Sequence, residues 1–436
     1  MGGVTLSRLR ELIRAKTDTR SLLVVACLAG MLFLGSWATI HHGFYSKDPH
    51  LDTPLYQGYA DLVRAGKVPY RDFSLEYPPG ALVAFVVPAL KNSPKPGPNN
   101  VRADYRRNFE FLMAACGLAS IALAAVALGR LGASNGKAAA ALTLLALSPL
   151  MLGAVMLSRF DLWPVMLALA GLVAILVGRE RIGFGVLGLA TAVKIFPAIL
   201  LPLGCIWVWK RARRRELAIC LGIFFAVLAA CFAPFLIVAP HGVWHSISVQ
   251  LSRPLQVESL GAATLIALHH LFGLGVSTVS GSGSENLAGT GSGAITALQT
   301  ALQAVALLAT WVWFARGEAS GERLMRAGAA SVIAFVAFGK VLSPQFMIWL
   351  IPFVLLVRGR RGIATSGLLV ASLVLTQLWF PSRYRDYAFG YAALPSVFVL
   401  LRDVVLVGIF AALLLVPRGR EQALPATEPA AIQPGI

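Results

Sequence analysis

The chain has 436 residues, of which 57% are hydrophobic and only 13% are charged, and long apolar runs recur along its length. This composition excludes a soluble globular protein and indicates an integral membrane protein. The net charge of +18 would suggest nucleic acid in a soluble chain. Here the Lys and Arg residues cluster at the ends of apolar runs, which is typical of cytoplasmic loops.

The first apolar run, "SLLVVACLAGMLFLGSWATI", follows a basic N-terminal segment. It is too long for a signal-peptide core and has no small-x-small cleavage site, so we interpret it as an uncleaved first span. Residues 1–20 are then a cytoplasmic basic tail and residues 21–417 a single transmembrane domain. Residues 418–436 are expected to be a disordered cytoplasmic tail.

The next segment, residues 42–107, is the first loop outside the membrane, and two short helices are predicted within it. "LDTPLYQGYADLVRAG" begins with a typical capping residue, Asp52, carries apolar residues at helical spacing and ends at Gly66. The apolar residues of this helix are Leu55, Tyr59, Leu62 and Val63. "PPGALVAFVVPAL" is too short to span a bilayer, so we place it in the outer leaflet.

Two carboxylates of this loop have both a structural and a functional interpretation. Taken alone, Asp52 fits a helix cap better than a catalytic group. Glu76 precedes "YPPG", and a carboxylate at a membrane face needs a partner or water, so a structural and a substrate-orienting role stay equally open.

The later basic clusters can all be cytoplasmic only if the run 183–209, which is basic at both ends, leaves and returns on the same side. Lys194 lies near its middle and Pro197 just beyond, so we predict a break that makes two half-length helices. Counting this hairpin as two passes gives about twelve membrane segments in an all-α, polytopic helical bundle. Both termini are then cytoplasmic.

Lys194 is hard to explain as a membrane anchor, because a charge in the middle of such a run costs roughly 2.5 kcal/mol or more. A functional role is the better interpretation. A break after Lys194 would place the free N–H groups of the second half-helix beside the ammonium, which is the pattern of a phosphate or pyrophosphate site.

Further polar residues fall on the same outer face. Arg159 and Asp161 flank Phe160, and a mutual ion pair is the simpler interpretation. Loop solvation is the alternative for the polar residues of "RPLQVESL", and membrane-interface snorkelling is the alternative for the lysine of "GKVLSPQF". The residues concerned are Arg253, Gln256, Glu258, Lys340 and Gln345.

Other features point to structure rather than to a site. The Gly/Ser-rich stretch 275–293 is expected to be flexible. Arg402 and Asp403 lie deep in the last run, and as sequence neighbours they are expected to point apart, each toward a partner on another helix. Adjacent His pairs and five scattered Cys residues do not have the spacing of a metal site, so no required metal is expected.

The outer-face charges suit a lipid-linked phosphate, and at this point the residues carry a family resemblance. The first loop resembles that of the family-87 glycosyltransferases, with an Asp-x-x-x-Tyr element at Asp52 and Tyr56 and a Tyr-Pro-Pro-Gly element at Tyr77. "TAVKIFPAILLPL", "RPLQVESL" and "KVLSPQFMIWLIP" are similar to later elements of the family, whereas Ser-Pro-Gln replaces a His-containing element in the last of these.

The resemblance implies a GT-C fold with an extracytoplasmic active site in the cell membrane. It also implies inverting transfer of a sugar from a polyprenyl-phosphate donor to a cell-envelope glycolipid or glycan, with mannose as the leading sugar and arabinofuranose as the alternative. Asp52 would be the general base and Lys194 would lie near the donor phosphate, with no cofactor beyond the lipid-linked donor. A lipid-linked sugar transporter and a non-catalytic scaffold are the competing classes.

Overall fold

The computed structural model describes residues 15–47, 52–90, 101–153, 155–211, 214–281 and 283–415. Most of the predicted N-terminal tail and all of the predicted C-terminal tail lie outside the described residues. Within the described residues, helices form nearly all of the regular structure, and a single two-stranded sheet is the exception. The prediction of a polytopic, all-α membrane protein is confirmed.

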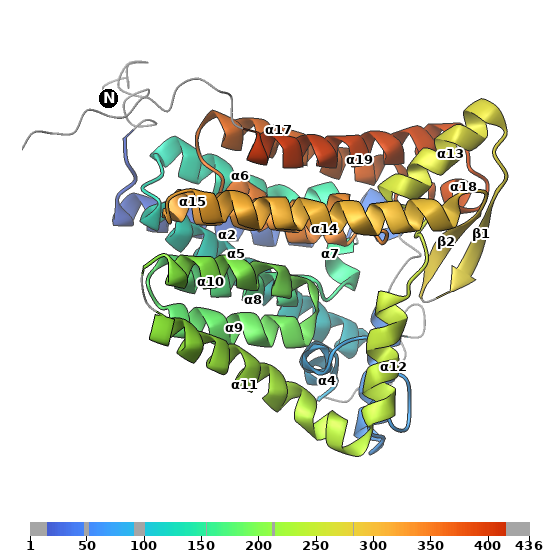
Figure 1. The fold of residues 1–436 in the computed structure, drawn as a ribbon, viewed down its shortest axis with the longest axis horizontal. Coiled ribbons are helices and arrows are strands. Elements are labelled where there is room, and N and C mark those ends of the chain that lie inside the picture. Colours follow the sequence, from blue (N-terminus) through green and yellow to red (C-terminus); the bar gives the residue numbers. More distant parts are fainter. Residues whose placement is uncertain are drawn as a thin grey trace, which may run out of the picture.

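Seven helices of the described chain are long and apolar enough to cross a membrane. They are α2 (Thr19–Thr39), α5 (Ala103–Arg130), α6 (Asn135–Leu152), α11 (Arg214–Val238), α14 (Ser292–Arg316), α17 (Gly359–Trp379) and α19 (Ala393–Leu414). Figure 1 shows most long helices running side by side along the longest axis of the molecule. Only 6% of the apolar window of α11 is buried inside the protein, which suits a helix that faces lipid.

Shorter helices complete the bundle. They are α7 (Val155–Ser158), α8 (Leu162–Leu176), α9 (Glu180–Val193), η5 (Phe196–Leu200), α10 (Leu201–Trp209), α13 (Leu260–Phe272), α15 (Gly321–Ala337) and α16 (Phe346–Leu355). Because several of these are too short to cross a bilayer as single helices, the total of about twelve membrane segments stays a prediction.

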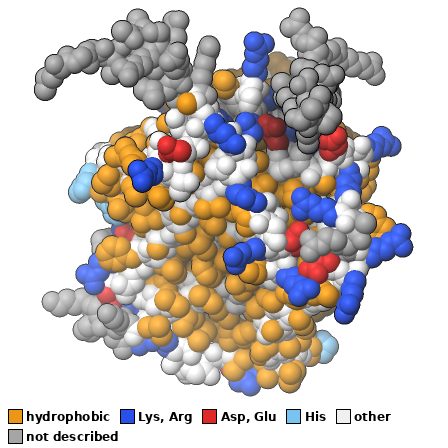
Figure 2. Space-filling model, turned by 90° about the vertical axis from the view of Figure 1, so that its left-hand side faces the viewer, with side chains coloured by type: hydrophobic (Ala, Val, Ile, Leu, Met, Phe, Trp, Pro, Cys, Tyr) orange, Lys and Arg blue, Asp and Glu red, His pale blue; other side chains and the backbone are white. Residues whose placement is uncertain are grey.

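One end of the bundle, on the left in Figure 1, is where α10 ends and α11 begins, and we call it the basic end because Lys and Arg side chains gather on it in Figure 2. There Arg358 donates to the carbonyl oxygens of Leu131 and Gly132, just past the end of α5, and Lys210 donates to that of Phe314 near the end of α14. These cations satisfy carbonyl groups at the negative ends of helices. Figure 2 views this end and shows many Lys and Arg side chains and few Asp or Glu.

The predicted hairpin is confirmed. Helix α9 ends at Val193, Lys194 is extended (φ −154°, ψ 140°), and η5 followed by α10 returns the chain. Arg211, after α10, lies 3.4 Å from the carboxylate of Glu180 at the start of α9, so both ends of the hairpin meet at the basic end.

The opposite end, which we call the polar end, holds the connecting elements. They are η1 (Gly43–Lys47), α3 (Thr53–Arg64), η2 (Pro79–Ala81), α4 (Leu82–Val86), η3 (Val87–Ala89), α12 (Pro240–Leu251), β1 (Val276–Gly281), β2 (Ser284–Gly289) and α18 (Tyr384–Ala388). In Figure 1, α12 runs across the direction of the long helices. Its Trp244 is 65% exposed, as expected for an aromatic residue at a membrane interface.

The first-loop helix forms where it was predicted. Tyr56, Tyr59 and Ala60 are buried, whereas Leu55 and Leu62 are exposed. One face of the helix therefore packs on the protein, and part of its apolar pattern lies on the outer surface.

The expectation of a flexible Gly/Ser stretch was wrong, because residues 276–281 of β1 pair antiparallel with residues 284–289 of β2. The strand β2 also pairs with the segment before α13: the N–H of Val257 donates to Glu285 (3.0 Å), and that of Leu287 donates to Leu255 (2.8 Å). β-Branched residues in β1 favour an extended backbone, and Gly283 adopts the left-handed conformation (φ 66°) next to the turn.

Candidate functional site

The side chain of Asp52 is not a helix cap. Asp52 occupies the position before α3, but among the described residues its carboxylate accepts no capping hydrogen bond. Instead it forms an ion pair with Arg159 and accepts a hydrogen bond from the Tyr56 hydroxyl (3.2 Å). The capping interpretation is therefore wrong for the side chain, and the carboxylate is committed to contacts inside the protein.

An aromatic cluster holds Tyr56 in place. Its ring stacks on that of Phe85 with centroids 4.5 Å apart and meets those of Phe160 and Tyr77 edge-on at 5.6 and 6.1 Å. Such offset and edge-to-face contacts stabilise a rigid arrangement. The cluster thus links the Asp52 helix to the turn that carries Arg159.

Arg159 and Asp161 do not behave as the mutual pair that was expected. Arg159 pairs with Asp52, whereas Asp161 lies 2.6 Å from the Lys194 ammonium. The indole N–H of Trp349 donates to the same carboxylate oxygen at 2.5 Å. Arg159 and Asp161, two positions apart in the sequence, therefore contact different elements. Arg159 contacts the residue before α3, and Asp161 contacts the helix break at Lys194 and α16.

Lys194 lies at the helix break in an aromatic cage. Its Nζ is 4.8 Å from the ring centroid of Phe160, 5.0 Å from that of Trp349 and 5.8 Å from that of Phe346. Cation–π attraction and the Asp161 carboxylate together offset the cost of burying the ammonium. The predicted cation at the break is present, but it already has a protein counter-ion.

Glu76 and Tyr77 lie in the loop that packs against the hairpin tip. A side chain at Gly80 would collide with the Ala192 carbonyl oxygen, only 2.7 Å from an added Cβ, so the loop and the tip are in close contact. The backbone carbonyl of Glu76 accepts from Gln250 (3.3 Å), and that of Tyr77 accepts from Tyr70 (2.6 Å). The Glu76 carboxylate itself has no hydrogen bond or ion pair to any described residue.

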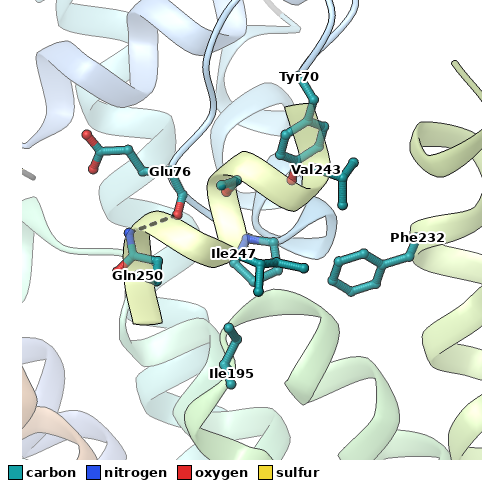
Figure 3. Close-up of a pocket in the computed structure, with 9 residues that line it drawn as sticks. Tyr70, Glu76, Ile195, Phe232, Val243, Ile247 and Gln250 are labelled. Atoms are coloured by element: carbon teal, nitrogen blue, oxygen red, sulfur yellow. Dashed lines mark hydrogen bonds between the residues drawn. The ribbon is translucent and has the colours of Figure 1, made fainter. Parts of the chain in front are cut away.

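A small pocket adjoins Glu76 (Figure 3). It is lined by Tyr70, Glu76, Pro78, Ile195, Phe232, Val243, Ser246, Ile247 and Gln250. Apart from Glu76, Ser246 and Gln250, these side chains are largely apolar, and they come from the first loop, the hairpin tip, α11 and α12. Figure 3 shows the Glu76 carboxylate pointing away from the apolar lining side chains, so the recess itself is mostly apolar.

Arg253 is a half-buried cation without a partner. Its Nε is buried, and within the described chain the guanidinium has no hydrogen bond or ion pair. Burial lowers the pKa of Arg253, and the nearby charge of Glu76 opposes this. An arginine of this kind stays protonated, so it offers charge to an incoming anion.

Gln256 and Glu258 are buried together, with the Gln256 amide donating to the Glu258 carboxyl at 3.0 Å. Burial raises the pKa of Glu258 to about 8, against the opposing charges of Arg402, Arg159 and Arg253. The effect of burial on the pKa of Glu258 thus outweighs that of the three arginines near it.

Lys340 and Gln345 have local contacts. The Lys340 ammonium donates to the Leu251 carbonyl at the end of α12 (2.9 Å), and the Gln345 amide oxygen accepts from Ser343 (2.8 Å). Lys340 still lies close enough to Arg253 for their charges to interact. It borders the site, whereas no contact of a described residue links Gln345 to Asp52 or Lys194.

One contributor, Trp349, escaped the sequence reasoning. It lies in the apolar stretch "FMIWLIP", where an indole looks like ordinary core. Arg402 was expected to have a buried partner elsewhere in the bundle, and it contacts the Glu258 backbone (2.7 Å) before α13. A Trp with a buried N–H requires an acceptor, which was the available signal for Trp349.

The described residues contain no group of three or more His, Cys, Asp or Glu side chains that could hold a metal ion. Of the histidines, His41 bonds to Glu110 (2.9 Å) and to the Trp37 carbonyl, and His269 bonds to the Leu274 carbonyl. These contacts account for both rings as structural groups.

The fold and site define a polytopic helical membrane protein with a cluster of buried and half-buried charges at its polar end. The chain matches the model of glycosyltransferase family 87 over residues 75–344, more than half of its length, and it belongs to that family. It is therefore a membrane glycosyltransferase. No curated protein and no solved structure matches it. Asp52 precedes the matched region, so its role rests on the geometry described above.

Proposed function

We propose that this glycosyltransferase moves mannose from a polyprenyl-phosphate donor to a hydroxyl of a cell-envelope glycolipid or glycan, with inversion. The reaction would take place at the extracytoplasmic face of the cell membrane, with the polar end outside and both termini in the cytoplasm. The observation that carries the proposal is the commitment of Asp52 to Arg159 and Tyr56 rather than to capping α3. Cations at the basic end support the orientation.

Asp52 is the proposed general base. It takes the proton of the acceptor hydroxyl as that oxygen bonds to the anomeric carbon, and the bond from that carbon to the phosphate oxygen breaks. The polyprenyl phosphate leaves with the electron pair, so no strong acid is required. Arg159 orients the carboxylate before the acceptor arrives.

Arg253 is the proposed principal contact for the donor phosphate, because it lies at the polar end and is half-buried with no hydrogen bond or ion pair to a described residue. Arg side chains bind phosphate oxygens in a planar, bidentate way. Lys194 adds charge from the helix break, although Asp161 already neutralises much of it.

We propose that transfer requires no divalent metal, since Arg159 already neutralises Asp52 and Arg253 provides charge for the phosphate. Activity in the presence of EDTA should then equal that in its absence. Activity that returns only when Mg²⁺ or Mn²⁺ is added would overturn this part of the proposal.

The test is to offer purified protein polyprenyl-phosphate mannose and polyprenyl-phosphate arabinofuranose with envelope lipid extracts as acceptors. Product mass identifies the sugar, and the anomeric configuration of the product reports inversion. A product made only from the arabinofuranose donor would replace mannose by the alternative sugar. Movement of intact donor across vesicles without any product would favour a transporter.

A further inference from the structure

Arg402 is a buried cation far inside a membrane-spanning helix. It is the tenth of the 22 residues of α19, so it lies roughly 13 Å along the helix from the polar end, and none of its surface is exposed. Its Nε donates to Asp403 (2.7 Å), contrary to the expectation that these two side chains point apart. Its Nη2 donates to the backbone carbonyl of Glu258 (2.7 Å).

The Arg402–Asp403 ion pair leaves some of its buried hydrogen-bonding atoms without partners in the described chain. Arg402 Nη1 and Asp403 Oδ2 are both buried and have no hydrogen-bond partner among the described residues. A buried ion pair with open hydrogen-bonding positions is commonly no more stable than apolar side chains of similar size. Stability alone therefore does not account for the pair. The hydrogen bond from Arg402 to the Glu258 carbonyl suggests a second role.

The segment that Arg402 contacts is fixed from several sides. The N–H of Gln256 donates to the Lys340 carbonyl (2.9 Å), and the Tyr387 hydroxyl of α18 donates to the Val257 carbonyl (2.6 Å). Strand β2 pairs with the same segment. Arg402 completes this set with a charged donor, and charged donors make the stronger hydrogen bonds.

Arg253 lies at the other end of this short segment. Pro254 follows it and restricts the backbone between Arg253 and the fixed residues 255–258. The position of the Arg253 guanidinium therefore depends on how firmly those residues are held.

We propose that Arg402 is a positioning residue: through the Glu258 backbone it fixes residues 253–258, so that Arg253 is held ready for the phosphate of a polyprenyl-phosphate ligand. This role rests on the proposed donor function. Arg402 does not touch the ligand, and Asp403 keeps its charge neutralised within the bundle.

The test measures binding of farnesyl phosphate, a short polyprenyl phosphate, to full-length protein in detergent by calorimetry. The variants are Arg253→Ala, the double variant Arg402→Met with Asp403→Leu, and the triple variant. We expect roughly tenfold weaker binding for the first two, and no further loss in the triple variant, because both changes act through one guanidinium. Arg402→Lys retains one charged donor and should recover part of the affinity.

In turnover assays the double variant should raise the donor KM roughly tenfold and change kcat less than threefold, while its thermal midpoint stays close to that of wild type. Losses that add in the triple variant, or wild-type affinity in the double variant, would overturn the positioning role alone. Wild-type protein that does not bind farnesyl phosphate would instead overturn the donor assignment and the positioning role with it.

Discussion

The two ends of the bundle use their charges in opposite ways. At the basic end, Lys210 and Arg358 donate to helix-terminal carbonyls that lie more than one hundred residues away in the sequence. At the polar end, the half-buried Asp52 pairs with Arg159 and the buried Asp161 pairs with Lys194. Arg253 has no partner there in the described chain. Lys210 and Arg358 thus stabilise helix ends, whereas the polar end combines buried ion pairs with a cation that no described residue neutralises, and this is why we propose the reaction site there.

The largest effect is expected for Asp52→Asn, which keeps the shape of the side chain and removes the base. Transfer should fall by roughly 10²- to 10⁴-fold, the range typical of general-base loss. Steady-state transfer from the polyprenyl-phosphate donor is the measurement.

The matched control is Asp61→Asn, in the same helix and also paired with an arginine, Arg102, at 2.7 Å. As a partly exposed pair it should matter little, with transfer within about threefold of wild type and a stability change of about 1 kcal/mol or less. Equal losses in both variants would show that α3 as a whole, rather than Asp52, is required.

Lys194→Met should be the most destabilising change at the polar end. It leaves the Asp161 carboxylate, only 1% exposed, without its counter-ion, at a cost of roughly 3–5 kcal/mol. Thermal unfolding in detergent measures this. Adding Asp161→Asn should restore the stability, because Trp349 still has an acceptor, but should not restore affinity for the donor. Wild-type stability in Lys194→Met would show that the ion pair is unimportant.

Glu258 should make stability depend on pH. Its pKa is raised from 4.5 to about 8 in the folded protein, so the folded state binds more protons than the unfolded state between these values. This contribution to stability is therefore complete below about pH 4.5 and is lost as the pH rises through about 8. The thermal midpoint of wild type should fall relative to that of Glu258→Gln over this range. Parallel curves for the two proteins would contradict the assignment.

The smallest effect is expected at the basic end, for Lys210→Ala. The lost contacts to helix-terminal carbonyls should change stability by about 1 kcal/mol or less and transfer by less than about twofold. Transfer assays run beside Asp52→Asn make the comparison direct. A large loss of transfer in Lys210→Ala would contradict the assignment of sugar transfer to the polar end and of structural contacts to the basic end.

Much of the framework could be predicted because it depends on local signals. The hairpin follows from Lys194, Pro197 and the basic residues at both ends of its run, and the structure breaks the helix at Lys194. The first-loop helix likewise follows from Asp52 and a short-range apolar pattern. The same local reasoning failed for the Gly/Ser stretch, because strands form only when a distant partner is available to pair.

The sequence by itself determined that the chain is a helical membrane protein, where its hairpin turns back and which residues carry unusual charge, since apolar length, proline and positive charge act over a few residues. Only the tertiary structure decided which charges meet. Asp161 contacts Lys194, which is 33 positions away in the sequence, and Trp349, which is 188 positions away. Arg402 contacts the Glu258 carbonyl, which is 144 positions away. Such pairings depend on how whole helices pack, because a buried charge takes the partner that the surrounding fold places beside it.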